Sequence, residues 1–258
     1  MENLSVGQYD LIYNAFSFSF ATLAAATIFF WLGRSQVAPQ FKTAMTITGL
    51  VTFIAAYHYF RIGESWANAF NVADGTIETT GYAFNQAYRY VDWLLTVPLL
   101  LVELILVMGL SRSETMSRAT RLGLLAALMI VLGYPGEVAT SNGARLFWGV
   151  ASMIPFLWIV YELYSGLSKS IENQPEDVRG LINVARFLVI GSWAFYPIVY
   201  FAGTVGLDGG LATVVIEVGY TIADITAKAV FGVLIFMIAL RKSAPYFEGQ
   251  KTSAQPAE

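Results

Sequence analysis

The sequence contains no cysteine and a single histidine, and only 13% of its 258 residues are charged. Without cysteine the protein can form neither disulfides nor thiolate metal sites. The sequence also lacks a cluster of metal-ligating residues and a glycine-rich nucleotide-binding loop. We therefore predict no metal site and no nucleic-acid partner.

Apolar residues make up 56% of the sequence, and its mean hydropathy is positive. Seven apolar runs are long enough to cross a membrane as helices, in which the backbone satisfies its own hydrogen bonds. The runs are Ile12–Leu32, Ala44–Tyr59, Tyr90–Leu110, Leu122–Pro135, Leu146–Leu167, Phe187–Leu207 and Leu211–Leu240. Short connections favour antiparallel packing of sequential helices in one bundle. We predict an all-α membrane protein with one seven-helix transmembrane domain (residues 1–248) and a disordered polar tail (residues 249–258).

Lysine and arginine residues gather at one end of the predicted bundle. If the N-terminus lies outside, eleven of the fifteen basic residues lie on the inner side and only two on the outer side. This asymmetry predicts an outer N-terminus and a cytoplasmic C-terminus, in a multi-pass protein of a prokaryotic plasma membrane. Between the second and third helices, Asn71–Tyr82 contains Asp74-Gly75 and predicts a small β-hairpin on the outer face.

A lysine lies inside the seventh apolar run. Lys228 is far from either end of Leu211–Leu240, and Asp224 precedes it by one helical turn. An ionisable side chain within a membrane is costly and therefore indicates a functional site. A buried lysine can form a Schiff base with a carbonyl compound, and a carboxylate at i−4 can balance a cation on the same helix face. The alternative is a transporter or receptor without a pigment, in which Lys228 only forms a buried ion pair.

Polar and ionisable side chains also follow one stripe of the third predicted helix. The stripe consists of Arg89, Asp92, Thr96 and Glu103. Spacings of three, four and seven residues place all four on one helix face. The alternative to a functional stripe is two unrelated ion pairs, Arg89 with Asp92 and Glu103 with a distant base. Counted from the inner helix ends, the depth order from outside to inside is Asp92, Lys228, Glu103, which is the order of acceptor, switchable base and donor in a proton path.

Several stretches of the sequence resemble microbial rhodopsins, and together they cover all seven helices. Two of them, Arg89–Pro98 and Asp224–Lys228, resemble the third and seventh helices of that family. The others are Tyr57–Arg61, Gly133–Glu137, Trp193–Pro197 and Gly219–Asp224. The resemblance is to the proteorhodopsin group, especially the xanthorhodopsin-like branch of light-driven proton pumps.

The resemblance implies a role for each ionisable residue in the membrane. Lys228 would carry all-trans retinal as a protonated Schiff base, with Asp92 as proton acceptor and Asp224 as second counterion. Glu103, in apolar surroundings, would rest protonated as the cytoplasmic proton donor, and Arg89 would control release on the outer side. The residues implied to line the retinal are Trp93, Trp193, Tyr196, Pro197 and Tyr220. The implied function is a light-driven outward proton pump, a transporter rather than an enzyme.

Three further residues gain a meaning from the resemblance. Thr96 completes, with Asp92 and Glu103, the triplet that resembles that of the proton pumps. His58 is implied to lie against Asp92 and tune its protonation, where the alternative is a packing histidine. Gly149 is similar to a glycine that opens a gap beside the retinal for a carotenoid antenna, and the alternative is close helix packing.

The sequence leaves two functional questions with alternatives. Glu217 lies two helical turns outward of Asp224, and it either lines a proton exit or faces water at a helix end. A sensory photoreceptor that signals through a partner protein is the alternative to a pump. The internal donor Glu103 favours the pump, because a sensor has little need for it. Small homo-oligomeric rings are expected by analogy with the family.

Overall fold

The computed structural model describes residues 4–202 and 209–253, and within them the protein is almost entirely helical. The helices are α1 (Val6–Gly33), α2 (Lys42–Ala69), α3 (Ala87–Met108), α4 (Arg112–Glu137), α5 (Asn142–Tyr161), α6 (Ser168–Glu172), α7 (Glu176–Ala202), α8 (Gly209–Ile225) and α9 (Phe231–Ser253). Two π-helical segments, Glu162–Gly166 and Thr226–Val230, join α5 to α6 and α8 to α9. The helices of the described residues therefore form seven rods.

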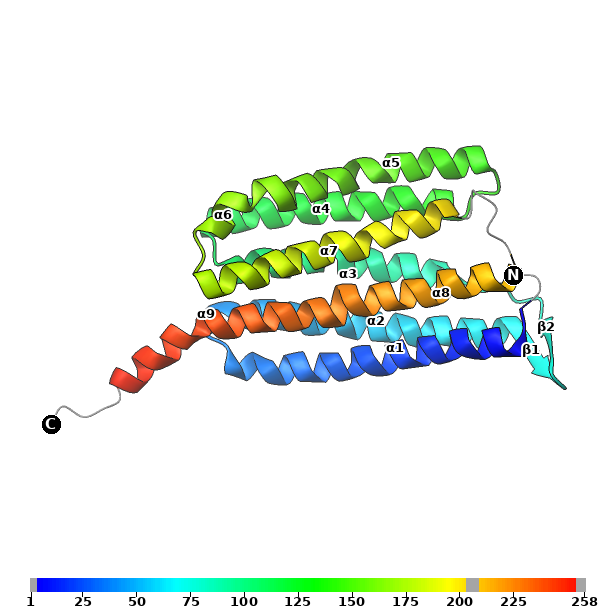
Figure 1. The fold of residues 1–258 in the computed structure, drawn as a ribbon, viewed down its shortest axis with the longest axis horizontal. Helices are drawn as coiled ribbons and strands as arrows, with labels where there is room; N and C mark the ends of the chain where they lie inside the picture. Colours follow the sequence, from blue (N-terminus) through cyan, green and yellow to red (C-terminus); the bar gives the residue numbers. More distant parts are fainter. Residues whose placement is uncertain (1–3, 203–208, 254–258) are drawn as a thin grey trace.

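The seven rods form one closed bundle (Figure 1). Sequential rods pack against each other, and α8 returns to pack against α1. The start of α1 and the end of α9 lie at opposite ends of the bundle, as an odd number of crossings requires. Among the described residues, six rods are long and apolar enough to cross a membrane by length and composition, and α2 is the seventh. The predicted seven-helix membrane bundle is confirmed.

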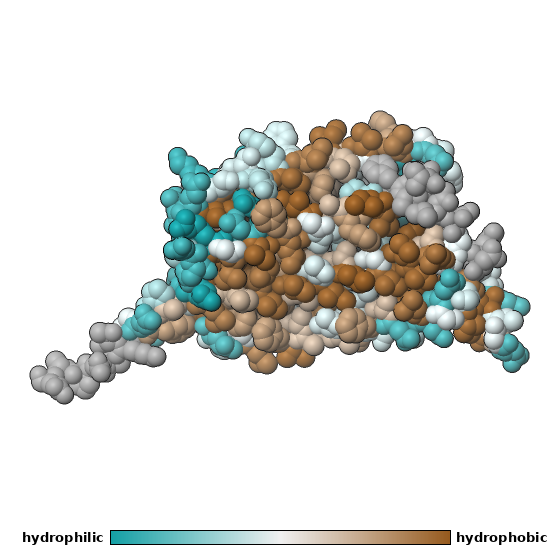
Figure 2. Space-filling view, in the orientation of Figure 1, coloured by the Kyte–Doolittle hydropathy of each residue, from teal (hydrophilic) through white to brown (hydrophobic). Residues whose placement is uncertain are grey.

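Apolar residues cover the middle of the bundle, and hydrophilic residues gather toward its two ends (Figure 2). Many large apolar side chains are exposed, among them Phe18, Ile28 and Ile154. A soluble monomer rarely exposes so much apolar surface, and the hydrocarbon core of a membrane covers it favourably. The surface therefore agrees with the seven predicted crossings.

A two-stranded hairpin follows α2, at the end of the bundle where α1 begins (Figure 1). Strands β1 (Phe70–Ala73) and β2 (Thr76–Thr79) pair antiparallel and leave Asp74 and Gly75 as a two-residue turn. Their φ angles are 51° and 75°, and a tight turn with positive φ at both positions favours this Asp-Gly pair. The predicted hairpin is confirmed.

Some helices begin well before the apolar runs that predicted them. α4 starts at Arg112 rather than at Leu122, because Ser111 caps its first turn by accepting a hydrogen bond from the backbone N–H of Glu114 at 3.3 Å. α7 likewise starts at Glu176, and its first turn contains two acidic residues, which are favourable at a helix N-terminus. A cap in α4 and acidic residues in the first turn of α7, neither of which the apolar pattern records, favour these boundaries.

Two predicted segments lie partly outside the residues that the structure describes. The end of the predicted sixth helix, residues 203–207, lies outside them. Within the tail predicted to be disordered, residues 249–253 continue α9 as helix, and residues 254–258 lie outside the described part.

Two rods, α3 and α8–α9, are the most enclosed of the candidate membrane spans. They also hold most of the buried ionisable residues of the described chain. On these rods the fully buried charged groups are Arg89, Asp92, Glu103, Glu217, Asp224 and Lys228. The fold thus brings the two segments that the sequence singled out into the centre of the bundle.

Candidate functional site

A π-helical turn, Thr226–Val230, positions Lys228 in the centre of the bundle. The side chain is 1% exposed. The sequence predicted a regular helix over Leu211–Leu240, and nothing in its apolar pattern indicated the wider turn. Such π turns occur as single interruptions of α-helices and are frequent at functional sites.

The Lys228 amine lies between two carboxylates. Its Nζ donates to Oδ2 of Asp92 on α3 and to Oδ1 of Asp224 on α8, both at 2.7 Å. All three side chains are buried, so the two carboxylates replace the water that a charged amine would otherwise need. The structure therefore brings together the lysine and both aspartates that the sequence singled out.

The two aspartates differ sharply in the number of donors they receive. Asp224 accepts hydrogen bonds from the Tyr59 hydroxyl at 2.8 Å and the Tyr196 hydroxyl at 2.6 Å. The indole Nε1 of Trp93 adds a third donor at 3.1 Å. Oδ1 of Asp92 has no hydrogen-bond partner among the described residues. Since hydrogen-bond donors stabilise the ionised form of a carboxyl group, Asp224 is held as an anion and Asp92 is the better placed to take up a proton.

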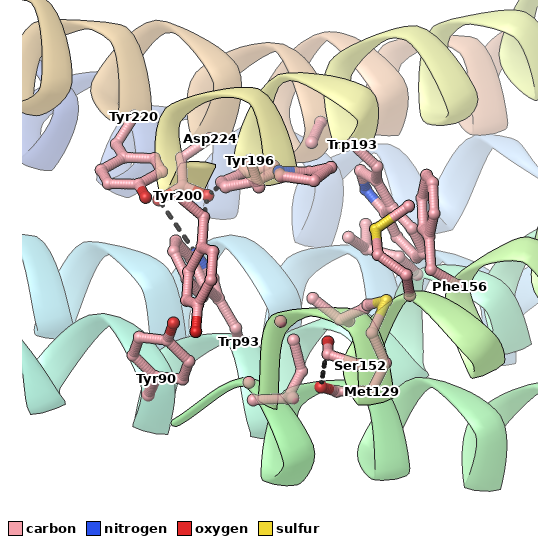
Figure 3. Close-up of a pocket in the computed structure, with 18 of the residues that line it drawn as sticks. Tyr90, Trp93, Met129, Ser152, Phe156, Trp193, Tyr196, Tyr200, Tyr220 and Asp224 are labelled. Atoms are coloured by element: carbon pink, nitrogen blue, oxygen red, sulfur yellow. Dashed lines mark hydrogen bonds between the residues drawn. The ribbon is translucent and has the colours of Figure 1, made fainter. Parts of the chain in front are cut away.

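Lys228 is among the residues that line an apolar cavity. Figure 3 shows aromatic side chains of its wall. Its walls come from α3, α4, α5, α7 and α8, and many of them are aromatic. The lining residues include Trp93, Gly149, Phe156, Trp193, Tyr196, Pro197, Tyr200 and Tyr220. The Trp93 and Tyr196 rings meet edge to face with centroids 4.9 Å apart, and Tyr196 stacks on Tyr220 at 5.7 Å. Apolar walls with a few converging polar groups are typical of a site for a small, apolar ligand.

On the outer side of Lys228, Arg89 pairs with Glu217. One guanidinium nitrogen of Arg89 donates to Oε2 of Glu217, and both side chains are almost fully buried. Gln86 bridges them, since its Nε2 donates to Glu217 at 2.7 Å and its Oε1 accepts from Arg89 at 3.2 Å. Glu217 is therefore no solvated residue at a helix end, and the alternative pair of Arg89 with Asp92 does not form.

On the inner side, Glu103 is fully buried and isolated. Neither carboxyl oxygen has a hydrogen-bond partner among the described residues, and no base pairs with it there. The Thr48 hydroxyl lies beside the carboxyl group and donates its own hydrogen to the carbonyl of Ala44 at 3.0 Å. A buried carboxyl group without a hydrogen-bond partner is disfavoured in its charged form. The surroundings thus favour a neutral Glu103.

Two predicted site residues contact Asp92 less directly than expected. The Thr96 hydroxyl donates to the backbone carbonyl of Asp92 at 2.8 Å and not to its carboxylate. The imidazole Nδ1 of His58 lies 2.9 Å from the carbonyl of Ile54, so this nitrogen must carry the hydrogen. His58 is close enough to act on Asp92 electrostatically, but no hydrogen bond joins the two.

Three residues of the site were not singled out from the sequence for the roles they hold. Tyr59 fixes Asp224, Gln86 bridges the outer ion pair, and Thr48 faces Glu103. The contacts of Tyr59 with Asp224, Gln86 with Glu217 and Thr48 with Glu103 join residues far apart in the chain, so no local spacing indicates them. Tyr59 does fall within a stretch that carried the family resemblance, and this was the only available signal.

Comparison with known proteins identifies the family. The family model described as bacteriorhodopsin-like protein matches residues 11–242. The green-light absorbing proteorhodopsin of Gamma-proteobacterium EBAC31A08 is 33% identical over 225 residues, which are 87% of this chain and 84% of that protein. The structure of xanthorhodopsin, described as a light-driven ion pump with dual chromophore, is 50% identical with a TM-score of 0.91 and covers 94% of this chain and 97% of its own. That of a thermophilic rhodopsin is 44% identical with a TM-score of 0.92, covering 95% and 99%. This multi-pass membrane protein therefore belongs to the bacteriorhodopsin-like family of microbial, type 1, rhodopsins.

Proposed function

We propose that this protein is a light-driven outward proton pump. The observation that carries the proposal is the arrangement around Lys228, whose buried amine lies between two unequal carboxylates. A third, isolated carboxyl group, Glu103, lies on the inner side. Carboxyl groups of different proton affinity lie on the two sides of a base whose own proton affinity can change. Such an arrangement can move a proton in one direction.

The residues around Lys228 fit retinal. The cavity reaches the amine, its walls are apolar and aromatic, and Trp93, Trp193 and Tyr196 would hold an extended apolar chain between them. Tyr220 and Pro197 complete this lining. Linked to the Lys228 nitrogen, retinal would supply the absorption of visible light and an isomerisation that lowers the proton affinity of that nitrogen.

The first proton transfer runs from Lys228 to Asp92. In the dark, the Lys228 nitrogen holds its proton because Asp92 and Asp224 both balance the charge in a low-dielectric site. When the proton affinity of the nitrogen falls, Asp92 Oδ2 lies within hydrogen-bond reach at 2.7 Å. Asp224 keeps its negative charge, because three other donors already stabilise it as an anion.

The return of a proton to Lys228 comes from Glu103. Glu103 follows Asp92 by eleven residues on the same helix, about 16 Å toward the inner side. A carboxyl group in apolar surroundings stays protonated and gives up its proton only when a strong base lies within reach. The deprotonated Lys228 nitrogen is that base.

The outer network completes the outward path. Arg89 and Glu217 lie outward of Asp92 on α3 and of Asp224 on α8, and Gln86 links the pair to the end of the bundle. Since the basic residues predict that this end faces outside, a proton that leaves Asp92 on this side leaves the cell. Glu217 lines this exit.

We further propose that Gly149 admits a second chromophore, a carotenoid antenna. Gly149 is buried in the cavity wall on α5, where the absence of a side chain leaves space beside the residues that would hold retinal. Its neighbours Phe147 and Val150 are exposed on the lipid-facing surface, so an apolar chain can reach this place from the membrane. Xanthorhodopsin, to which the chain is 50% identical, is described as having a dual chromophore.

Light-induced pH changes test the pump directly. Cells that express the protein with added retinal are expected to acidify the medium in the light, and a protonophore should remove the change. Lys228→Ala, which keeps the helix but removes the amine, is the matched control and should give no pH change. A pigment that absorbs visible light but acidifies nothing would favour the sensory alternative. For the antenna, Gly149→Trp should abolish energy transfer from added carotenoid and keep the retinal absorption.

A further inference from the structure

Three groups form a closed hydrogen-bonded cluster at the inner end of α3. Lys242 Nζ donates to the carbonyl of Met108 and to Oε1 of Gln174, both at 2.7 Å. Gln174 Nε2 donates to the same Met108 carbonyl at 3.0 Å. The cluster therefore joins the last turn of α3, the turn before α7 and the helix α9. We call these three groups the inner latch.

The latch is built into the fold rather than placed by chance on the surface. Gly109 follows α3 with a φ of 65°, a backbone conformation that ends the helix and favours glycine. A Cβ at Gly109 would lie 3.1 Å from Lys242 Nζ, so the glycine also leaves space for the amine. Lys242 is partly buried over the ring of Phe41, 5.6 Å from its centroid. No carboxylate lies within ion-pair distance of it in the described chain, and its charge is balanced by the carbonyl end of α3.

The position of the latch relates it to Glu103. Met108 follows Glu103 by five residues, about 8 Å along the helix axis toward the inner side. Between them, Leu104, Ile105 and Val107 are fully buried. Glu103 itself is 0% exposed, so a proton from the inner side cannot reach it in this structure. A donor that gives up its proton in every cycle must nevertheless be refilled from that side.

We propose that the inner latch controls proton entry to Glu103, with Lys242 as its positioning residue. The closed latch holds α3, α9 and the start of α7 together and keeps water away from the donor. Opening it breaks the two hydrogen bonds of Lys242 and lets water reach Glu103. This inference rests on the proposed function, because it takes Glu103 to be the donor.

Hydrogen–deuterium exchange of the Glu103 carboxyl group in the dark tests the latch without the pumping cycle. The retinal-loaded protein is transferred to D2O, and the carboxyl stretching band that is absent in Glu103→Gln is followed by infrared spectroscopy. Lys242→Met keeps the packing over Phe41 but removes the donors of the amine. Gln174→Leu weakens the latch, because it removes one of the two acceptors of Lys242 while the charge stays. Arg241→Gln is the matched control, because it removes a cation at the same depth that is exposed and pairs with Asp177 instead.

Exchange is expected to be at least about tenfold faster in both variants, because Gln174→Leu removes one hydrogen bond of the charged Lys242 and Lys242→Met removes two. Proton uptake after a flash should be faster in the same two variants, while the first transfer to Asp92 and the absorption band stay unchanged. Unchanged exchange and uptake in both variants, or an equal acceleration in Arg241→Gln, would overturn the latch and leave the pump intact. If no carboxyl band depends on Glu103, the donor assignment fails and the latch fails with it.

Discussion

The outer and inner halves of the bundle are built differently around the same lysine. Outward of Lys228, ionisable and hydrogen-bonding groups follow one another, from the two aspartates to the pair of Arg89 and Glu217 and on to Gln86. Inward of Lys228, Glu103 is the only carboxyl group of α3, and apolar side chains enclose it. The outer half is rich in buried polar groups, and the inner half of α3 holds one carboxyl group in apolar surroundings.

This difference indicates how direction arises. A proton that leaves Asp92 on the outer side meets further buried polar groups, the pair of Arg89 and Glu217 with Gln86, before it reaches the end of the bundle. A proton on the inner side must cross an apolar barrier, which happens only when the structure opens. The closed inner half therefore prevents the proton from returning inward at the moment when it leaves Lys228.

The largest effect is expected at the residue that the two halves share. Lys228→Ala removes the only amine in the cavity, so no covalent pigment can form and the two aspartates lose their buried partner. We expect complete loss of the visible band and of light-driven acidification, measured on purified protein and on cells. A normal visible band that resists bleaching by hydroxylamine in this variant would contradict the assignment.

Replacing each aspartate in turn tests whether the different hydrogen bonding of Asp92 and Asp224 matters for function. Asp92→Asn is expected to abolish pumping and to shift the absorption band to longer wavelength, because the cation loses one of its two carboxylate partners. Asp224→Asn should instead lower the amount of folded pigment, since the donors from Tyr59 and Tyr196 lose a charged partner. Absorption spectra and flash-induced pH changes distinguish the two. Identical behaviour of both variants would show that the difference in hydrogen bonding has no functional meaning.

Glu103, the isolated inner carboxyl group, is expected to affect the rate at which a proton returns to Lys228 rather than the absorption band. Glu103→Gln keeps the shape of the side chain and removes the transferable proton, so the return of a proton to Lys228 should slow by at least about 100-fold. The first transfer to Asp92 and the absorption band should remain close to those of the parent. Time-resolved absorption measures both steps, and a return step as fast as in the parent would rule out Glu103 as the donor.

The outer ion pair is expected to matter more for stability than for pumping. Glu217→Gln leaves the buried Arg89 without a charged partner, which should destabilise the protein by about 3 kcal/mol. Pumping should continue with altered release of the proton. Thermal loss of the pigment band gives the stability. Glu64→Gln, at an exposed pair with Arg61, is the control and should change it little.

The smallest effect is expected from the hydroxyl group beside the donor. Thr48→Val keeps the size of the side chain but removes the hydroxyl group that lies beside Glu103. The return step should change by at most about fivefold, because the hydroxyl group lies beside the carboxyl group without a hydrogen bond to it. Time-resolved absorption measures this step. A change as large as that of Glu103→Gln would mean that Thr48 itself carries the proton.

Most of the fold could be predicted from the sequence, because the membrane imposes a strong pattern. Apolar runs locate the rods, and Asp74-Gly75 locates the turn of the hairpin. The helix ends depend on caps such as Ser111, and the π turn at Lys228 depends on packing against other helices. Neither is recorded in the periodicity of apolar residues.

For the site, the sequence indicated which residues matter but not whom they contact. The stripe on α3 and the lysine on the seventh rod are visible as ionisable groups in apolar runs. The ion-pair partner of Arg89 could not be recognised from the sequence, because Glu217 lies 128 residues away in the chain. The inequality of the two aspartates also appears only once Tyr59, Tyr196 and Trp93 are placed around one of them.

Infrared difference spectroscopy after a flash tests most directly which carboxyl group receives the proton from Lys228. We expect a protonated carboxyl band to appear as the Lys228 nitrogen loses its proton, to be absent in Asp92→Asn and to persist in Glu103→Gln. A band that persists in Asp92→Asn and disappears when Asp224 is replaced would contradict the account.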